Sequence, residues 1–343
     1  MKTIEYKGQT LNTTKYIEIS QEEYENIVKE YYTKPSYDQV KTQFVDLSHN
    51  FLQNDKITNY YFKDLMAKVK IWFNKWSIEE ALEYKPLVEF FVGKVSTNKK
   101  IYPDTMSMCE KIETAFRLCG KGIASKPANF PIKTVDFILE NYNVNGNYYD
   151  FSCGWGARLT SALKNRVNYY GTDPNYLLTE RLNQLANDYR DTMKQDTIVD
   201  IKTQGSEIFV PEWENTIGVA FSSPPYFYLE DYKIGNQSWK KGTTYQEWKD
   251  YYLEPTFRNI YKYLIDKGYF ILNINNFDKY KLVEDSIEIA TNIGFTLVRE
   301  HTLENIDRCK LSGGFNDGNE KIMVFMKKGF ESDYMVNQQI SLF

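Results

Sequence analysis

Short apolar runs alternate with amphipathic segments over the last two thirds of the 343-residue chain. Apolar runs of about four to eight residues are typical of buried strands, and longer segments with apolar residues at helical spacing are typical of helices. This pattern predicts strands at residues 147–150, 167–171, 217–221 and 268–274, and helices at 135–141, 157–163, 243–262 and 279–293. Strands that alternate with helices indicate an α/β fold built on a parallel sheet.

Two more strands are predicted near the end of the chain, at residues 295–300 and 321–326. The loop between them contains Gly313, Gly314 and Gly318 and has no helical spacing. Strands with no helix between them can pair antiparallel, so this segment predicts a terminal hairpin.

The first 125 residues are predicted to be mostly helical. Capping boxes begin at Ser20 and Ser77, each with a glutamate three residues later, and apolar residues at helical spacing occupy 39–52, 60–76 and 104–118. Glycines and prolines concentrate around residues 120–131, which is the best candidate linker. We therefore predict a helical domain at 1–125, which could recognise DNA or another partner, and an α/β domain at 126–343.

Composition and charge narrow the classes of function. The formal net charge of −4 and the sequence pI near 5.5 argue against a surface that grips phosphates everywhere, so any nucleic-acid site must be a local basic patch. The chain has only two histidines and no Cys-x-x-Cys pair, which argues against structural zinc and a disulfide framework, and we expect no metal. No apolar stretch approaches membrane length, and a reducing cytoplasm is the expected location. The four cysteines are Cys109, Cys119, Cys153 and Cys309.

A turn containing Gly154 and Gly156 follows the strand at 147–150 and leads into a helix. Such glycines allow a ligand to approach the backbone closely, and the helix N-terminus presents N–H groups to it. Leu159 stands where the dinucleotide fingerprint needs a third small residue. Asp173 follows the next strand, about twenty residues past the glycines, at the distance where an acidic side chain meets ribose hydroxyls. An adenosine-type ligand is therefore expected.

The tetrapeptide Ser223-Pro224-Pro225-Tyr226 ends the apolar run 217–221. Consecutive prolines fix a rigid turn whose carbonyls point outward, so the turn can hold an exocyclic amino group while the aromatic ring stacks on its base. The other interpretation is a proline stop after a buried strand, with Tyr226 as a cover. Because ligands of parallel sheets collect at the carboxyl ends of strands, we expect this turn, the glycine loop and Asp173 to face one cleft.

These two motifs resemble those of S-adenosylmethionine-dependent DNA amino-methyltransferases, which modify N6 of adenine or N4 of cytosine. The family's catalytic loop is Asp, Asn or Ser followed by Pro-Pro and an aromatic residue, and the tetrapeptide at 223–226 matches it. Its cofactor loop is Asp-Pro-Phe-x-Gly-x-Gly; Asp150 and both glycines match, whereas Phe151 and Ser152 replace the proline and the phenylalanine. The resemblance covers roughly residues 127–328. It implies a Rossmann-like, seven-stranded class I methyltransferase core with a terminal antiparallel hairpin.

The resemblance also implies a role for each motif residue. The Ser223 hydroxyl and the Pro224 carbonyl would hold the target amino nitrogen, and Tyr226 would stack on a base that is flipped out of a duplex or presented in a single strand. S-adenosylmethionine would be the cofactor. The residues expected to bind it are Asp150, Phe151, Ser152, Cys153, Gly154, Gly156, Asp173 and Pro174.

Residues 227–244 lack periodicity, and we interpret them as a mobile loop over the cleft, the alternative being an ordinary surface loop. The side chains expected to contact substrate there are Phe227, Glu230, Tyr232, Lys240 and Lys241, with the two lysines on nucleic-acid phosphates. The helix at 60–76 also mixes lysines with aromatic residues. That mixture fits either a nucleic-acid surface or a solvated face over a buried stripe.

The sequence thus predicts a DNA methyltransferase, with cytosine N4 slightly favoured over adenine N6 because serine at the first catalytic position is more usual in the resembling cytosine enzymes. Methylation at cytosine C5 would need a cysteine beside the proline, and the loop has none. One alternative is an RNA or protein-glutamine N-methyltransferase. The other alternative is a non-catalytic DNA-binding or interaction protein on the same fold. The Ser152 substitution in the cofactor loop and the acidic pI favour this alternative.

Overall fold

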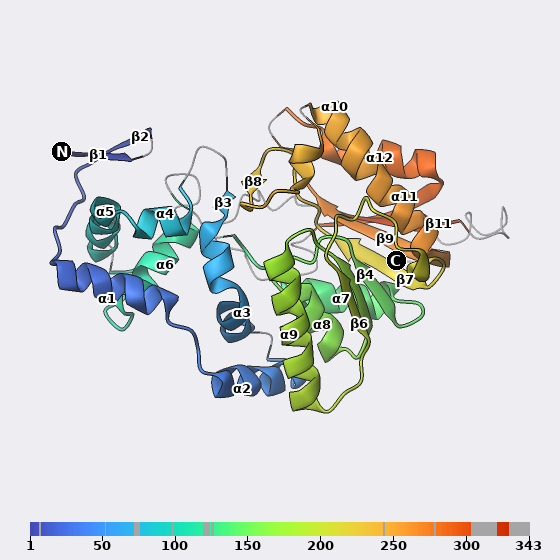
Figure 1. The fold of residues 1–343 in the computed structure, drawn as a ribbon, viewed down its shortest axis with the longest axis horizontal. Coiled ribbons are helices and arrows are strands. Elements are labelled where there is room, and N and C mark those ends of the chain that lie inside the picture. Colours follow the sequence, from blue (N-terminus) through green and yellow to red (C-terminus); the bar gives the residue numbers. More distant parts are fainter. Residues whose placement is uncertain are drawn as a thin grey trace.

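A seven-stranded sheet with helices on both faces forms the larger part of the molecule, and a group of helices lies at one end of it (Figure 1). The structure is a computed structural model. It describes residues 1–343 except 7, 52, 72–75, 98, 119–123, 125–126, 243, 278, 303–320 and 329–343. The glycine-rich loop predicted between the last two strands lies outside the described residues.

The strands of the large sheet lie in the order β10-β11-β9-β7-β4-β5-β6. Neighbouring strands from β9 to β6 pair parallel, and β11 pairs antiparallel with both β9 and β10. This arrangement confirms the predicted class I methyltransferase core and its terminal hairpin. The strands are β4 (Asn147–Asp150), β5 (Asn168–Thr172), β6 (Val199–Lys202), β7 (Ile217–Ser222), β9 (Leu264–Ile274), β10 (Phe295–Thr302) and β11 (Lys321–Lys327).

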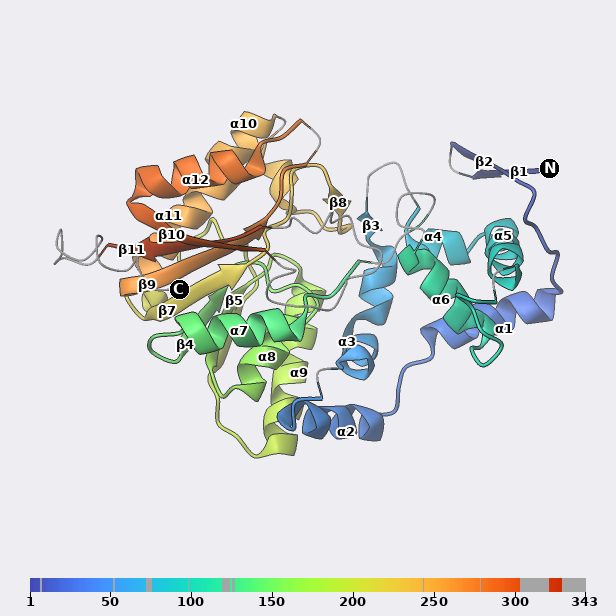
Figure 2. The same cartoon turned by 180° about the vertical axis from the view of Figure 1, so that it is seen from behind.

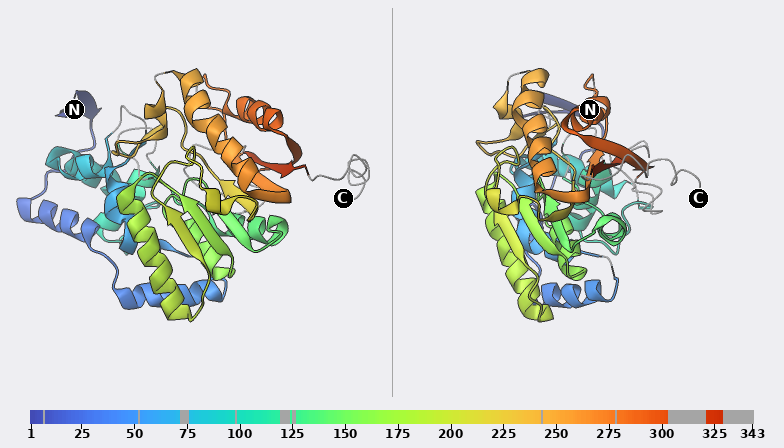
Figure 3. Two further views of the ribbon diagram at one scale, coloured as in Figure 1. Left: turned by 45° about the vertical axis from the view of Figure 1, so that its right-hand side comes forward. Right: turned by 90° about the vertical axis from the view of Figure 1, so that its right-hand side faces the viewer.

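Successive strand residues point to opposite faces of the sheet and build two separate cores. The helices α7, α8 and α9 cover one face of the sheet, and α11 and α12 cover the other (Figures 2 and 3). Tyr148 and Tyr169 belong to the core on the first face, whereas Tyr149 and Phe270 belong to the core on the second. The helix predicted at 243–262 is observed as three successive pieces, the middle one a π-helical turn, η3. The helices are α7 (Ile132–Tyr142), α8 (Ala157–Lys164), α9 (Tyr176–Met193), α10 (Tyr245–Trp248), η3 (Lys249–Leu253), α11 (Glu254–Tyr263) and α12 (Leu282–Ile293), with a 3-10 turn η1 (Pro211–Trp213).

A third core lies in the N-terminal part, which is mostly helical as predicted. The Ser20 side chain caps its first helix by accepting from Glu23 N, and Ser77 forms the predicted capping box with Glu80. The hairpin of β1 and β2 was not predicted. The elements are β1 (Lys2–Tyr6), β2 (Gln9–Thr13), α1 (Gln21–Tyr32), α4 (Ile78–Leu82), α5 (Lys85–Ser96) and α6 (Met108–Leu118).

Two helices of the N-terminal part, α2 (Tyr37–Ser48) and α3 (Asp55–Lys68), pack on the α/β core instead. Arg181 of α9 forms two hydrogen bonds with the Asp64 carboxylate, at 2.5 and 2.8 Å, and Tyr61 donates to Asp188 at 2.5 Å. Lys63 is buried and pairs with Glu113, so this lysine of the predicted lysine-aromatic surface is turned inward. The division near residue 125 stays a prediction.

The helix predicted at 60–76 ends at Lys68 and is followed by a two-residue strand, β3 (Lys70–Ile71). This strand pairs antiparallel with β8 (Glu230–Asp231), which belongs to the predicted substrate loop. The pairing joins the N-terminal part to the segment that follows the Ser-Pro-Pro-Tyr turn. Within the described residues, no helix combines the length and the apolar composition that a membrane span requires.

Candidate active site

Three loops leave the sheet at the carboxyl ends of the adjacent strands β7, β4 and β5. They carry the Ser-Pro-Pro-Tyr turn, the glycine loop and Asp173, which the fold therefore brings together as the sequence predicts. The loops are also in contact: Ser222 Oγ donates to Ser152 O at 3.3 Å, and Cys153 N donates to Thr172 O at 3.4 Å.

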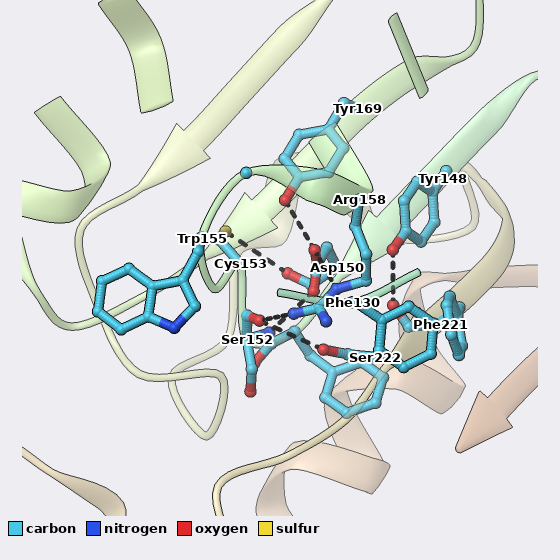
Figure 4. Close-up of polar contacts among 12 residues, drawn as sticks. Phe130, Tyr148, Asp150, Ser152, Cys153, Trp155, Arg158, Tyr169, Phe221 and Ser222 are labelled. Carbon is cyan, nitrogen blue, oxygen red and sulfur yellow. Dashed lines mark hydrogen bonds and ion pairs between the residues drawn. The ribbon is translucent and has the colours of Figure 1, made fainter. Parts of the chain in front are cut away.

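The Asp150 carboxylate supports the glycine loop from the sheet side (Figure 4). It is fully buried, and it accepts from Arg158 Nε at 2.8 Å, from the Tyr169 hydroxyl at 2.8 Å and from Ser152 N at 3.2 Å. Arg158 also donates through Nη2 to the Ser152 carbonyl. Asp150 thus acts on the loop conformation, and a direct contact of its side chain with cofactor stays a prediction.

Arg158 is a site residue that the sequence analysis did not identify. Burial lowers the pKa of its guanidinium, but the charge and hydrogen bond of Asp150, together with Tyr148 and Tyr169, raise the pKa above its ordinary value. The Phe130 ring covers the guanidinium with its centroid 5.6 Å from Cζ. An arginine between Ala157 and Leu159, on a helix whose neighbouring positions are apolar, was the available signal.

The two glycines meet different requirements. Gly154 and Gly156 have φ angles of +58° and +81°, in the left-handed region that favours glycine. A Cβ on Gly156 would lie 2.8 Å from Cε2 of Phe62, so α3 can approach the loop only because this residue is glycine. Gly156 is also the N-cap of α8, which directs the N-terminus of that helix toward the loop.

Asp173 lies directly after β5, as predicted, and its carboxylate reaches the glycine loop. Burial raises its pKa from 3.8 to about 7, and the nearby charge of Asp150 adds to the increase. Hydrogen bonds from the backbone N–H groups of Asn175, at 2.9 Å, and Gly154 act in the opposite direction. Pro174 leads from Asp173 to Asn175, whose side chain caps α9.

Phe151 and Cys153 have buried side chains, and their roles as cofactor-binding residues stay predictions. Phe151 is 2% exposed and packs on Phe270 with ring centroids 5.9 Å apart. Cys153 is buried, and its Sγ lies 3.4 Å from Thr172 O. These residues can offer only backbone atoms to a ligand, whereas Ser152 lies at the contact between the two loops.

The Ser-Pro-Pro-Tyr turn is held by the end of β9. Asn273 Nδ2 donates to Ser223 Oγ at 3.4 Å, and the backbone N–H of Asn275 donates to the Tyr226 hydroxyl at 2.6 Å. Pro224 is buried and Pro225 is half-buried. These contacts fix the position of the Tyr226 ring, whose stacking on a base stays a prediction.

Phe227 and Lys241 do not lie as the sequence analysis expected. Phe227 is 2% exposed and packs among Tyr245, Trp248 and Tyr280, so it serves the core and not a substrate. Lys241 Nζ lies 2.9 Å from Glu207 Oε1, and this carboxylate neutralises the charge that a phosphate would need. Lys240 is exposed, and its Nζ donates to Ile234 O at 2.9 Å.

Glu230 and Tyr232 reach over the glycine loop from β8 and the residue after it. The two side chains hydrogen-bond to each other, and the Tyr232 ring lies 6.3 Å from that of Trp155. Burial raises the pKa of Glu230. The pKa of Tyr232 is raised by burial first and then by the charges of Glu230 and Asp173.

A second group of polar side chains that the sequence analysis missed stands beside Asp173. Burial raises the pKa of the Tyr252 hydroxyl; hydrogen bonds with Ser152 and Ser206 oppose the increase, and the charges of Glu207 and Asp173 strengthen it. Both carboxylate oxygens of Glu207 are buried; Oε1 pairs with Lys241 Nζ, and Oε2 accepts no hydrogen bond from the part of the chain that the structure describes. Glu207 follows β6, a strand that the analysis had not located.

The charges at this edge of the sheet are unbalanced. Asp173, Glu207 and Glu230 bring three carboxyl groups together, and Lys241 is the cation that pairs with one of them. Burial disfavours the charged forms of Asp173 and Glu230, and a ligand that carries positive charge would offset this effect, whereas a pyrophosphate would add to it. The arrangement therefore suits a cationic adenosine-type ligand better than a dinucleotide.

Comparison with known proteins gives only remote structural similarities. No protein-family model matches the chain, and a comparison with curated proteins gives no match. A TehB-like S-adenosylmethionine-dependent methyltransferase from Corynebacterium glutamicum is 14% identical, with a TM-score of 0.39 over 62% of this chain and 92% of that one. Magnesium protoporphyrin IX methyltransferase from Synechocystis is 12% identical, with a TM-score of 0.38 over 57% and 79%. At such identities the likeness is one of fold alone.

Proposed function

We propose that the chain is an S-adenosylmethionine-dependent methyltransferase that modifies an exocyclic amino group of a DNA base. One observation carries the proposal. The Ser-Pro-Pro-Tyr turn directly follows Ser222, the last residue of the central strand β7, and Ser222 donates to the Ser152 carbonyl of the glycine loop after β4. A turn suited to an amino group thus lies beside a loop suited to adenosine.

The residues at the sheet edge fit S-adenosylmethionine. The backbone of residues 152–156 would face it, Asp173 would accept its ribose hydroxyls, and the carboxyl groups of Glu207 and Glu230 would complement its positive charge. When bound, the cofactor supplies an electrophilic methyl group. Glu207 Oε2, which accepts no hydrogen bond from the described residues, matches an amino group of the cofactor in hydrogen-bonding character, whereas Oε1 is paired with Lys241.

The chain's own task is to position the nucleophile. Ser223 Oγ accepts from Asn273 at 3.4 Å and retains a lone pair, which with the Pro224 carbonyl would accept the two amino hydrogens of the target. Both hydrogen bonds favour a more tetrahedral nitrogen, whose lone pair is then less delocalised into the ring. No strong base is required for this reaction.

The target base is proposed to be cytosine at N4, with adenine at N6 as the second choice. This preference rests on Ser223, because serine is more usual at that position in the resembling cytosine enzymes. The mechanism is the same for either base, since both present an exocyclic amine next to a ring nitrogen. RNA and a glutamine side chain carry amino groups of the same character and are tested alongside DNA.

The test is transfer of a labelled methyl group from S-adenosylmethionine to DNA, RNA and protein by the purified chain. We expect label in DNA, and we expect Ser223→Ala to lower turnover by about 10- to 100-fold, the loss expected for one hydrogen bond of 1.5–3 kcal/mol. Cofactor affinity should persist in this variant. Ser48→Ala, at an exposed serine on α2, is the matched control. Label that appears only in RNA or protein would reject the DNA substrate.

A further inference from the structure

Tyr228 and Trp239 form an aromatic surface on the segment that follows the catalytic turn. Their ring centroids lie 5.2 Å apart with an interplanar angle of 33°. Tyr228 is 41% exposed, whereas its neighbour Phe227 is 2% exposed. A large ring is therefore held outward two residues beyond Tyr226.

The backbone fixes the outward position of Tyr228. Its φ angle is +55°, a left-handed conformation that is unfavourable for a bulky side chain and that often occurs at functional sites. Phe227 is anchored by edge or tilted contacts with Tyr280 at 5.3 Å, Tyr245 at 5.7 Å and Trp248 at 5.9 Å. The Tyr228 ring packs at right angles to the Phe227 ring, with centroids 4.5 Å apart, while 41% of Tyr228 stays exposed.

Trp239 is oriented by the hydrogen bonds of Gln237. Its indole Nε1 donates to Gln237 Oε1 at 3.3 Å, and the same oxygen accepts from Tyr232 N at 2.7 Å. Lys240 places its Nζ 5.3 Å from the Trp239 ring centroid and is exposed. The surface thus combines two oriented rings with one positive charge at its edge.

We propose that Tyr228 and Trp239 stack on an unpaired base next to the target base, with Lys240 facing its phosphate. The proposal rests on the function proposed above and extends it to the substrate: the chain would bind a short unpaired stretch and not only one flipped nucleotide. Any base offers a flat π-face to such rings, and the cation complements the backbone charge. Binding at this surface is therefore expected to tolerate different sequences.

The test measures fluorescence anisotropy of a labelled single-stranded oligodeoxynucleotide with S-adenosylhomocysteine present, so that no methyl transfer occurs. Tyr228→Asn is the main variant, because asparagine adopts left-handed backbone readily and should preserve the fold. We expect Tyr228→Asn and Trp239→Ala each to weaken binding roughly tenfold, and Tyr228→Phe to retain it. Tyr251→Ala, at a tyrosine that is 58% exposed on η3, should leave binding unchanged.

The outcomes separate this proposal from the one it rests on. If Tyr228→Asn and Trp239→Ala methylate DNA with unchanged oligonucleotide affinity and KM, the stacking surface is rejected and the DNA methyltransferase stands. If the unaltered chain neither binds nor methylates DNA, both proposals are rejected. Weaker binding in both variants, with thermal melting like that of the unaltered chain, supports the stacking surface.

Discussion

The buried pair of Asp150 and Arg158 determines the shape of the glycine loop. Their side chains are 0% and 7% exposed, and each also bonds to Ser152, Asp150 through the backbone N–H and Arg158 through the carbonyl. Replacing one member of such a pair leaves the other charge buried without compensation. A substitution in this pair should therefore disturb the loop more than a substitution in a surface ion pair.

Asp150→Asn is predicted to lower the free energy of unfolding by about 3–5 kcal/mol, the cost of breaking a buried ion pair. Urea denaturation measures the change. Asp38→Asn removes a carboxylate that is 86% exposed and pairs with Lys41, and it should leave the unfolding midpoint unchanged. Equal midpoints for the two variants would show that Asp150 does not support the loop.

The raised pKa of Asp173 predicts that folding stability and cofactor affinity change with pH in opposite directions. Its pKa in the folded chain, about 7, lies above the ordinary value of 3.8. The folded state therefore binds more protons between these values, and the stability that this group contributes is lost as the pH rises through about 7. Binding to ribose hydroxyls needs the carboxylate as acceptor, so cofactor affinity should rise over the same interval.

Calorimetric titration of S-adenosylmethionine between about pH 6 and pH 8 measures how cofactor affinity depends on pH. Thermal melting of the cofactor-free chain measures how stability depends on pH. Asp173→Asn should flatten both profiles and weaken binding by roughly 10- to 100-fold. Profiles that remain unchanged in this variant would remove Asp173 from the cofactor site.

At the scale of elements, the segment from Glu230 to Lys241 is organised by one side chain. Gln237 is 3% exposed; its Oε1 accepts from Tyr232 N and Trp239 Nε1, and its Nε2 donates to Asp231 Oδ1 at 2.8 Å and Ile234 O at 3.2 Å. All four hydrogen-bonding sites of the amide are thus in use.

Gln237→Glu removes both donors and sets a second carboxylate against Asp231. We predict a loss of stability of about 1–3 kcal/mol and a higher KM for DNA, because the hydrogen bonds to Asp231 of β8 and to Ile234 are lost and the segment that carries Trp239 is no longer held to β8. Differential scanning calorimetry and initial rates test this. Gln39→Glu is the control, since glutamate serves equally well in the capping box with Ser36. If the KM for DNA of Gln237→Glu equals that of the unaltered chain, the segment takes no part in substrate binding.

The sequence predicted strands where the chain carries an apolar run, and in the centre of the sheet such runs are buried on both faces. β7, for example, is buried at each of its six positions and begins at the predicted residue Ile217. The sequence analysis did not predict β6, because this four-residue edge strand has only two alternating apolar residues, Val199 and Ile201, and each is only half-buried. The two-residue strands β3 and β8 have no periodicity, and their pairing joins segments about 160 residues apart in sequence.

The candidate site was predictable where its residues directly follow strands. The glycine loop, Asp173 and the Ser-Pro-Pro-Tyr turn belong to this group. The partners Arg158, Glu207 and Tyr252 come from a helix, the loop after an undetected edge strand and a π-helical turn, and their roles depend on tertiary contacts that no local pattern encodes.

At the scale of the whole molecule, the net charge of −4 makes DNA binding depend on few cations. Lys240 is exposed, whereas Lys241 is paired with Glu207. Replacing both lysines by alanine should therefore reduce the slope of log affinity against log salt by about 0.7–0.9, the contribution of one phosphate contact, and not by the two units expected from sequence. Lys240→Ala alone should give the same slope as the double variant; a further decrease in the double variant would contradict the Lys241–Glu207 pair.

The central claim is that this chain methylates an exocyclic amino group of a DNA base. Its most direct test is mass spectrometry of nucleosides digested from DNA after incubation with the purified chain and S-adenosylmethionine that carries a deuterated methyl group. The account predicts deuterated N4-methylcytosine, which Ser223→Ala and Tyr226→Ala diminish while cofactor binding persists. Deuterated N6-methyladenine would change the base and keep the mechanism. DNA without any deuterated nucleoside, from a preparation shown to bind the cofactor, would contradict the account.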